Sequence, residues 1–366
     1  MKHVITILCL IARLDASPTK FFFLSNAFIE EINSKQDSWE AGRNFGEDVS
    51  LVELGLLTGT FMEGREKELR LVKTFDPKWP ERDQIPKNFD ARQKWRKMCP
   101  RIGEVVDQGR CGSCWAISAA GSFTDRYCIA TNGKHQMRLS AANVLSCCRD
   151  CGEGCDGGWE HLAWGYFHKY GLPTGGGWNT TEGCQPYSIP SPCKRSYNRH
   201  CPYKTCPLFD VTPKCQTRCT NKAYEKTLRK DRHFSGKEYA LPKDERAIMK
   251  EIMTHGPVTA AFIAMYDFPH YKKGVYMPTE GAAPLGGHAV KVIGWGSHRN
   301  KPYWLVMNSW NQYWGDRGVV KMMRNHPLIN LEDECWAAIP DLKRKKTCDD
   351  EVIWGDIWDW ETRQQT

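Results

Sequence analysis

Asp-Gln-Gly-Arg-Cys-Gly-Ser-Cys-Trp-Ala, residues 107–116, is the stretch of this sequence that decides the fold. A glycine–serine pair before Cys114 permits a tight turn, and the residues after it favour a helix. We therefore expect Cys114 at a helix N-terminus, where unpaired N–H groups and the helix dipole favour a thiolate. Gln108 could direct an amide N–H, together with the backbone N–H of Cys114, at a developing oxyanion. The stretch predicts a nucleophilic cysteine. A redox pair with Cys111, or half of a zinc site, is the alternative.

Two later segments can supply a base and its partner. Residues 286–296 (GGHAVKVIGWG) and 303–310 (YWLVMNSW) are apolar and β-rich, and the residues between them have the composition of a turn. An antiparallel hairpin centred near residue 298 would place His288 directly opposite Asn308. Asn308 could then hold the imidazole in one tautomer, and His288 could deprotonate the cysteine. The pattern predicts a Cys-His-Asn site.

Length and charge limit the class of protein. The chain has 366 residues, 41% of them hydrophobic, which suffices for two packed halves and a removable segment. Its net charge of +8 is spread along the chain without a basic helix or an aromatic-basic platform, so we expect no nucleic-acid partner. Residues 1–16 have the pattern of a secretory signal, and their apolar run is too short to span a bilayer. We expect no membrane span elsewhere.

The cysteines indicate both a boundary and a compartment. The chain has 17 cysteines, none of them within residues 17–84 and most of them within residues 99–219. Such density behind a signal sequence indicates an oxidising compartment. Four-thiol zinc binding by Cys147, Cys148, Cys151 and Cys155 is the competing interpretation. In the cysteine-free segment, the spacing of Phe28, Ile29, Ile32 and Trp39 predicts an amphipathic helix.

The Cys-Gly-Ser-Cys-Trp, Gly-Gly-His and Asn-Ser-Trp motifs, in this order, resemble the papain family of cysteine proteases. From about residue 21 to about residue 340 the chain is similar to the cathepsin B branch of that family. The resemblance implies an α+β, papain-like two-domain fold with an N-terminal propeptide. A helical left half would carry Cys114, and a β-barrel-like right half would carry His288 and Asn308. It implies no metal and no organic cofactor.

The resemblance also divides the chain. It implies a signal peptide at 1–16, an inhibitory propeptide at 17–84, a peptidase domain at 85–340 with its occluding-loop region at 193–206, and a C-terminal extension of unknown role at 341–366. In this branch, the propeptide stretch at Thr58–Phe61 lies across the cleft in reverse and blocks it. Thr58 replaces a cysteine that is usual there, which leaves the steric block intact.

Disulfides follow only from the resemblance, because spacing alone leaves the pairing open. The implied pairs are Cys99–Cys128, Cys111–Cys155, Cys147–Cys215, Cys148–Cys151, Cys184–Cys219 and Cys193–Cys206. Besides the signal-peptide cysteine and the nucleophile, Cys201, Cys335 and Cys348 are left over.

Substrate-binding positions are carried over in the same way. Gly157, Gly158 and Trp159 correspond to the cleft wall, where backbone pairs with an extended substrate. Ala289 and Trp310 flank the catalytic pair on the leaving-group side. Glu334 corresponds to the base of the S2 pocket, where a carboxylate would accept arginine as well as apolar P2 side chains. Asn179-Thr180-Thr181 is a glycosylation sequon.

The occluding-loop region departs from the branch. The usual His-His pair that grips a substrate's C-terminal carboxylate is replaced by Arg195 and Ser196, and the loop is longer and carries Cys201. One usual acid partner survives as Asp107, whereas the second loop-anchoring acid is replaced by Tyr313. We therefore predict a looser loop, better endopeptidase access and weakened dipeptidyl-carboxypeptidase activity.

An alternative for this loop stays open. Lys194, Arg195 or His200 could supply the positive partner of the carboxylate, because arginine suits a carboxylate well. The enzyme would then retain peptidyl-dipeptidase activity.

The sequence as a whole predicts a cathepsin B-type cysteine endopeptidase made as a zymogen. Expected partners are protein and peptide substrates, the chain's own propeptide and cystatin-type inhibitors. The expected location is the secretory pathway, ending in the lysosome or outside the cell, for example in a digestive lumen. The rival functions are a thiol-disulfide oxidoreductase using Cys111 and Cys114, and a catalytically silent homologue that acts as a binding protein.

Overall fold

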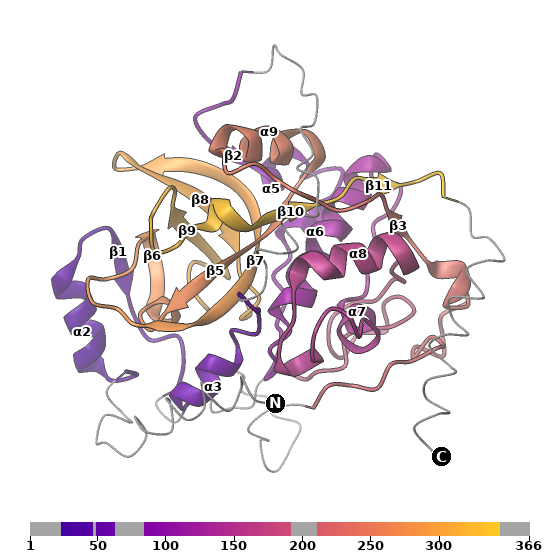
Figure 1. Ribbon diagram of the computed structural model, residues 1–366, viewed down its shortest axis with the longest axis horizontal. Coiled ribbons are helices and arrows are strands. Elements are labelled where there is room, and N and C mark those ends of the chain that lie inside the picture. The colour runs from indigo at the N-terminus through magenta and orange to yellow at the C-terminus, as the bar shows by residue number, and fades with distance from the viewer. Residues whose placement is uncertain (1–22, 47–48, 63–83, 192–210, 345–366) are drawn as a thin grey trace.

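The computed structural model describes residues 23–46, 49–62, 84–191 and 211–344. A helical half lies beside a sheet-rich half, as the resemblance implies, and the N-terminal segment crosses between them (Figure 1). The described elements, in chain order, are α2 (Asn26–Lys35), β1 (Trp39–Ala41), α3 (Leu51–Leu56), β2 (Phe89–Asp90), α5 (Ala91–Lys94), η2 (Pro100–Gly103), α6 (Cys114–Ala130), α7 (Ala141–Cys147), η3 (Gly154–Asp156), α8 (Glu160–Tyr170), η5 (Arg229–Asp231), β3 (Phe234–Ser235), β4 (Tyr239–Ala240), α9 (Glu245–His255), β5 (Val258–Met265), η6 (Phe268–His270), β6 (Tyr271–Tyr276), β7 (Pro284–His298), β8 (Lys301–Met307), β9 (Val319–Met323), η7 (Leu331–Glu334), β10 (Cys335–Ala337) and β11 (Pro340–Asp341).

The helical half is built around α6, which is buried along most of its length. Helix α6 packs against α7 and α8 on one side and against the strands β5 and β7 on the other. Phe123 of α6 stacks on Phe167 of α8, with ring centroids 5.2 Å apart. A helix buried on all sides is held by its packing, so its first residue has a fixed position.

The sheet-rich half follows the order β1-β6-β9-β8-β7-β5-β10-β4, and β2 adds to β7. The long strand β7 pairs with both β5 and β8, so it lies in the centre of this half. Val290 and Val292, on one face of β7, belong to the main apolar core with Phe262 and Trp304. This packing fixes the strand that carries His288.

Strands β7 and β8 form the predicted antiparallel hairpin, but the predicted register, with His288 directly opposite Asn308, is wrong. Strands β7 and β8 are joined by Arg299 and Asn300, which both have positive φ (48° and 63°), as a two-residue turn with right-handed strand twist requires. Because this turn is shorter than expected and the register shifts beyond Val292, Lys291 pairs with Met307. Asn308 therefore lies just beyond the end of β8. It is a diagonal neighbour of His288 and does not lie directly opposite it.

Trp39 is a second correction, because it does not belong to the N-terminal helix. Helix α2 ends at Lys35, and the Gln36 side chain accepts a hydrogen bond from the backbone N–H of Trp39 at 3.0 Å. Trp39 opens β1 and pairs with Gly274 of β6. Its indole Nε1 donates to the carbonyl of Met277 at 2.9 Å. The N-terminal segment thereby adds a strand to the edge of the sheet.

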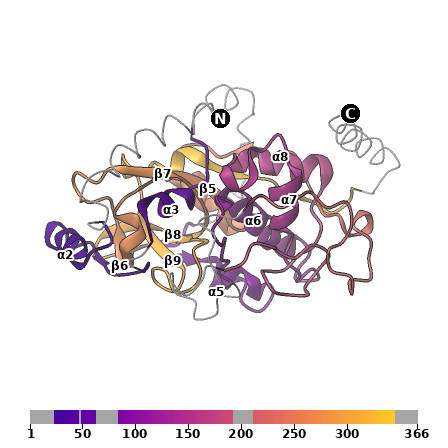
Figure 2. The same ribbon diagram turned by 90° about the horizontal axis from the view of Figure 1, so that it is seen from below.

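The rest of this segment reaches the junction of the two halves. Helix α3 lies over the line where the sheet meets α6 (Figure 2). Ser50 and Glu53 form a capping box at its start, and Glu53 also forms an ion pair with Arg110. The helix thus binds the stretch that carries the candidate nucleophile.

Five of the six implied disulfides are present in the structure: Cys99–Cys128, Cys111–Cys155, Cys147–Cys215, Cys148–Cys151 and Cys184–Cys219. The implied Cys193–Cys206 pair, Cys201 and Cys348 lie outside the described residues. Cys335 is a buried free thiol. The pairing excludes the zinc interpretation, because all four of its thiols are in disulfides. It also excludes the Cys111–Cys114 redox pair, because Cys111 is bonded to Cys155 and Cys114 is a free thiol.

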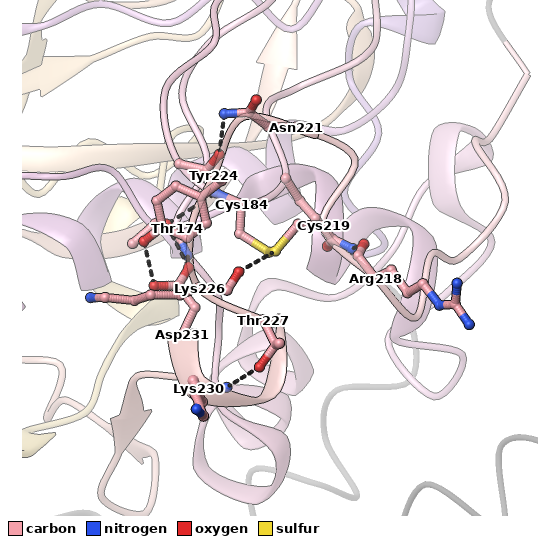
Figure 3. The surroundings of a disulfide bond; sticks show 12 residues. Thr174, Cys184, Arg218, Cys219, Asn221, Tyr224, Lys226, Thr227, Lys230 and Asp231 are labelled. Atoms are coloured by element: carbon pink, nitrogen blue, oxygen red, sulfur yellow. Dashed lines mark hydrogen bonds between the residues drawn. A yellow bond between two sulfur atoms is a disulfide. The ribbon is translucent and has the colours of Figure 1, made fainter.

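The Cys184–Cys219 bridge lies beside a buried polar cluster (Figure 3). Asp231 accepts hydrogen bonds from the hydroxyls of Tyr224 at 2.7 Å and Thr174 at 2.5 Å. Although burial opposes it, the hydrogen bonds lower the pKa of Asp231 to about 2. The bridge and this cluster fix the chain on either side of the occluding-loop region.

Within the described ranges, no helix has the length and apolar character needed to cross a membrane. The same residues bring together no cluster of three or more His, Cys, Asp or Glu side chains that could hold a metal ion.

Candidate active site

The site begins where α6 begins. Cys114 is the first residue of α6, at the helix N-terminus that the sequence predicts. Its thiol is buried and lies 3.3 Å from the hydroxyl oxygen of Thr60. It packs in a small cluster with Ala261 and Ala289, the residue that follows His288. The cysteine of the helical half therefore packs against β7, the strand of the other half that carries His288.

His288 and Asn308 are hydrogen-bonded to each other. The His288 Nε2 atom lies 2.8 Å from Asn308 Oδ1, which requires the proton on Nε2. Asn308 Oδ1 also accepts the backbone N–H of Ser309 at 2.8 Å, which fixes the amide orientation. The other imidazole nitrogen, Nδ1, is buried and has no hydrogen-bond partner in the described part of the chain. The ring is thus held in the tautomer whose Nδ1 can accept a proton.

Trp310 covers this pair. Its ring centroid lies 4.8 Å from that of His288, and it is almost fully buried. An aromatic ring at this distance keeps water from the His288–Asn308 hydrogen bond. A hydrogen bond out of water is electrostatically stronger.

Gln108 directs its amide into the cleft. Its Nε2 donates to the carbonyl of Cys111 at 2.8 Å and to the carbonyl of Leu57 in the N-terminal segment at 3.0 Å. The amide cannot turn over, because its Oε1 accepts the hydroxyl proton of Ser309 at 2.7 Å. Ser309 is a residue that the sequence reasoning missed, although its place beside Asn308 was a usable signal. The backbone carbonyl of Leu57, from the N-terminal segment, therefore already accepts a hydrogen bond from the Gln108 amide.

The segment around Thr60 fills the cleft. Thr60 N–H donates to the carbonyl of Gly287 at 2.9 Å, and Phe61 N–H donates to the carbonyl of Gly158 at 3.0 Å. Gly158 N–H in turn donates to the carbonyl of Gly59 at 2.9 Å. The segment is therefore held as an added strand between the two walls. It occupies the space that an extended peptide would need.

The other expected wall residues also contact this segment. Trp159 packs edge-on against Phe61, with ring centroids 4.8 Å apart. A Cβ atom built on Gly157 would come within 2.5 Å of the Phe61 ring, so only glycine permits this approach. Gly157, Gly158 and Trp159 thus form one wall of the cleft.

Burial under this segment sets the charge state of the pair. It raises the pKa of the Cys114 thiol above its ordinary value of 9.0, and hydrogen bonds with Ala289 and Thr60 oppose this only in part. Burial also lowers the pKa of His288 to about 4. Both shifts favour the neutral thiol and the neutral imidazole over the thiolate–imidazolium pair. In this covered state the site is assembled but uncharged.

Glu334 is connected through a strand pairing to the cluster of Cys114, Ala261 and Ala289. It ends η7, and the next residue, Cys335, pairs with Ala260 of β5, the neighbour of Ala261. The Met62 side chain packs against the Cys114 cluster from the N-terminal segment. Glu334 is half-buried.

The loop partners divide between the described and undescribed parts of the chain. Arg195, Ser196 and His200 lie outside the described residues. Asp107 is half-buried, and loss of solvent around its carboxylate raises its pKa, whereas hydrogen bonds with Gly109 and two neutral side chains oppose the shift. Tyr313 is 58% exposed. Within the described ranges, the groups that shift the pKa of Asp107 include no cation.

Comparison with known proteins now gives the family. The family described as papain family cysteine protease matches residues 85–339, and the peptidase family C1 propeptide matches residues 24–64. The chain belongs to the papain family of cysteine proteases. The N-terminal segment in the cleft is therefore a propeptide, and the structure is that of a zymogen.

Individual relatives place the chain more closely. Cathepsin B-like cysteine proteinase 4 of Caenorhabditis elegans is 40% identical over 316 residues, which are 86% of this chain and 92% of that protein. A cathepsin B-like cysteine proteinase of Schistosoma japonicum is 38% identical over 321 residues, 86% of this chain and 91% of that protein. The solved structure of proCathepsin B S9 from Trypanosoma congolense has a TM-score of 0.73 and 33% identity, covering 87% of this chain and 99% of that one. This chain is a cathepsin B-like cysteine protease.

The pKa shifts give a pH prediction for alkylation of Cys114. In the zymogen, the midpoint of the rise in iodoacetamide alkylation rate should lie above pH 9.0, because burial raises the pKa of the Cys114 thiol above that value. In the processed enzyme, an imidazolium partner should bring the rise below pH of about 7.5. Rates at a series of pH values, with the labelled residue identified by mass spectrometry, measure both midpoints. Coinciding midpoints would show that the propeptide does not control the charge state.

A second prediction concerns the close approach of Gly59 to the nucleophile loop. A Cβ atom at Gly59 would lie 1.9 Å from the Gly112 carbonyl oxygen, so Gly59→Ala must displace the propeptide from the cleft. Cys114 of the zymogen variant should be alkylated at least about tenfold faster, because a propeptide that binds about 1.4 kcal/mol more weakly leaves the cleft about ten times as often.

Gly55→Ala is the matched control for this variant. Its Cβ would meet only Leu285 at 4.0 Å, and alanine favours the α3 helix. Alkylation of Gly55→Ala should be no faster than that of the unchanged zymogen. Equal rates for the Gly59 and Gly55 variants would refute the steric account.

Proposed function

We propose that this protease is an endopeptidase of cathepsin B type that cleaves through Cys114, His288, Asn308 and Gln108. The observation that carries the proposal is the hydrogen bond from Gln108 Nε2 to the Leu57 carbonyl, together with the packing of Cys114 against Ala289, the residue that follows His288. A backbone carbonyl held in that place imitates the carbonyl of a substrate.

Chemistry at this site would be acyl transfer. The Cys114 thiol gives its proton to Nδ1 of His288, which becomes an imidazolium. The Cys114 sulfur then attacks the peptide carbonyl carbon, and the carbonyl oxygen gains negative charge that Gln108 Nε2 and the Cys114 backbone N–H stabilise. The imidazolium of His288 gives its proton to the amine as the carbon–nitrogen bond breaks. Water then attacks the thioester with His288 as base, and the thiol is restored. Asn308 holds the proton on Nε2 throughout, so Nδ1 is the nitrogen that takes and gives the catalytic proton.

The experiment compares the processed enzyme with its Cys114→Ala variant on one long peptide with a free C-terminus. Mass spectrometry follows the products over time. Internal cuts that disappear with the variant would support the proposal, because they need the nucleophile and an open cleft. Identical internal cuts by the variant would contradict the role of Cys114.

We also propose that the occluding loop is loosened and that dipeptide removal is weakened. The support is the replacement of the second anchoring acid by the exposed Tyr313, and the neutral partners of Asp107. In the alternative, Arg195 or His200 binds the C-terminal carboxylate of the substrate, and the enzyme retains its dipeptidase activity.

The loop proposal gives a direct kinetic prediction. Two copies of one peptide, with a free and an amidated C-terminus, should have kcat/KM values that agree within about twofold. A cation that binds the free carboxylate would favour the free peptide by about tenfold or more, because hydrogen bonds to charged groups contribute about 1.5–3 kcal/mol. That preference, together with stepwise loss of C-terminal dipeptides, would establish the alternative.

Specificity for arginine at P2 is a further proposal. It rests on the half-buried Glu334 carboxylate at the end of η7, next in the chain to the strand β10 that pairs with β5. Glu334→Ala should lower kcat/KM for a P2-arginine substrate by about 10- to 100-fold, the loss of a charge-assisted hydrogen bond. A P2-phenylalanine substrate should change little.

Asp333→Ala is the control for this prediction. Asp333 is the adjacent carboxylate, and it pairs with the exposed Lys243 at 2.9 Å. The variant should keep the P2-arginine preference. If Glu334→Ala keeps it too, Glu334 does not form the pocket.

The disulfides and the exposed sequon at Asn179 support proposals about the location and glycosylation of the protein. Five disulfides in a cathepsin B-like protease indicate the secretory pathway, and we propose the lysosome or the extracellular space as its place of action. Asn179 lies on an exposed turn, which supports glycosylation there. The domain limits at residues 16, 84 and 340, and cystatin-type inhibitors as partners, are proposals as well.

A further inference from the structure

Tyr187 is a buried residue that the chemistry above does not use. It is 4% exposed, and its hydroxyl donates to the backbone carbonyl of Gln108 at 2.9 Å. The same hydroxyl lies 2.7 Å from the Ser113 Oγ atom. Because a phenol has one proton and the Gln108 carbonyl can only accept, the Ser113 hydroxyl must donate to the Tyr187 oxygen. One directed relay therefore runs from Ser113 through Tyr187 to Gln108.

The Ser113 end of this relay is at an unusual place. Ser113 is the N-cap residue of α6, where a serine side chain ordinarily accepts a hydrogen bond from the first turn of the helix. Here Ser113 makes no such side-chain cap, as the described residues show. Its hydroxyl is turned to Tyr187 instead, and the residue that follows it is Cys114. The serine thus ties the helix start to Tyr187 and leaves the N–H groups of the first turn uncovered by a side chain.

Backbone packing brings the Tyr187 segment against the other end of the relay. Gly109, next to Gln108, has φ of +67°. A Cβ atom there would lie 2.5 Å from the Pro190 carbonyl oxygen and 2.6 Å from the Ile189 side chain. The segment from Tyr187 to Pro190 therefore packs directly on the turn that carries Gln108.

We propose that Tyr187 is a positioning residue for the oxyanion site, because a single hydroxyl sets the spacing between Gln108 and the start of α6. The proposal rests on the proposed role of Gln108 and of the Cys114 backbone N–H as oxyanion donors. The Tyr187 hydroxyl contacts both donor segments, through Ser113 and through the Gln108 carbonyl, so we assign it an indirect role. Donors must be held to within about 0.5 Å of their working positions, and loss of the relay would relax that restraint.

The test uses the processed full enzyme and its Tyr187→Phe variant, which removes only the hydroxyl. We expect kcat for a peptide amide to fall about tenfold, with KM nearly unchanged. The rate of Cys114 alkylation by iodoacetamide should stay the same, because displacement at a saturated carbon forms no oxyanion. Ser113→Ala, which removes the other end of the relay, should lower kcat in the same direction.

Tyr166→Phe is the matched control. Tyr166 is a buried tyrosine of the same half, and its hydroxyl donates to Asn143 Oδ1 at 3.1 Å, away from both donors. This variant should retain kcat, which would separate the effect of Tyr187 from the general effect of removing a buried hydroxyl.

A cycle with Gln108→Ala completes the experiment. Once the Gln108 donor is gone, the Tyr187→Phe change should cost much less than it does alone, because the two act on one function. The proposal is overturned if kcat is unchanged in Tyr187→Phe, if alkylation falls in parallel with kcat, or if the full loss persists beside Gln108→Ala. An unchanged kcat in Gln108→Ala alone would instead refute the proposed oxyanion role of Gln108.

Discussion

The backbone hydrogen bond from Gln108 N–H to the Ser309 carbonyl, 2.9 Å long, is the contact on which the site depends. It joins the stretch that precedes the nucleophile to the stretch that follows Asn308, and the isolated pairing of Asp107 with Trp310 extends it. The two halves of a papain-family protease contribute different catalytic groups, so neither half has a site alone. A fixed junction lets the buried helix α6 and the buried strand β7 hold their reactive groups against one another. Small displacements at such a junction would reach every group in the site.

The zymogen uses the same junction for control. The propeptide enters as a strand at the sheet edge, continues through α3 and then pairs with both cleft walls. It blocks access, and it also removes water from the thiol and the imidazole, which favours their uncharged forms. Inhibition therefore has a steric part and an electrostatic part. Removal of one segment reverses both without rebuilding the hydrogen bonds of His288 and Asn308.

Much of this arrangement could be predicted from local signals in the sequence. The Cys114 helix start, the Gly-Gly-His strand and the resemblance to a known family gave the fold and the partners that meet in the site. Strand register was the weakest inference, because it depended on a turn that Arg299 and Asn300 form in the left-handed region without glycine. Trp39 was assigned to a helix because its spacing fits one, but Gln36 ends the helix and tertiary pairing with Gly274 takes Trp39 into the sheet. The hydrogen bonds that Ser309 and Tyr187 make with Gln108 were missed, because such contacts join residues far apart in the chain and leave no periodic pattern.

Covalent labelling with a peptidyl chloromethyl ketone tests the central claim most directly. That claim is that one complete site around Cys114 is present in the zymogen and is opened by removal of the propeptide. Mass spectrometry of the intact chain and of its fragments would count and locate the label before and after processing. The account predicts no label on the zymogen and one label on the processed enzyme, on Cys114, that is lost in His288→Ala. Equal labelling of the zymogen, or a label on Cys335 in place of Cys114, would contradict it.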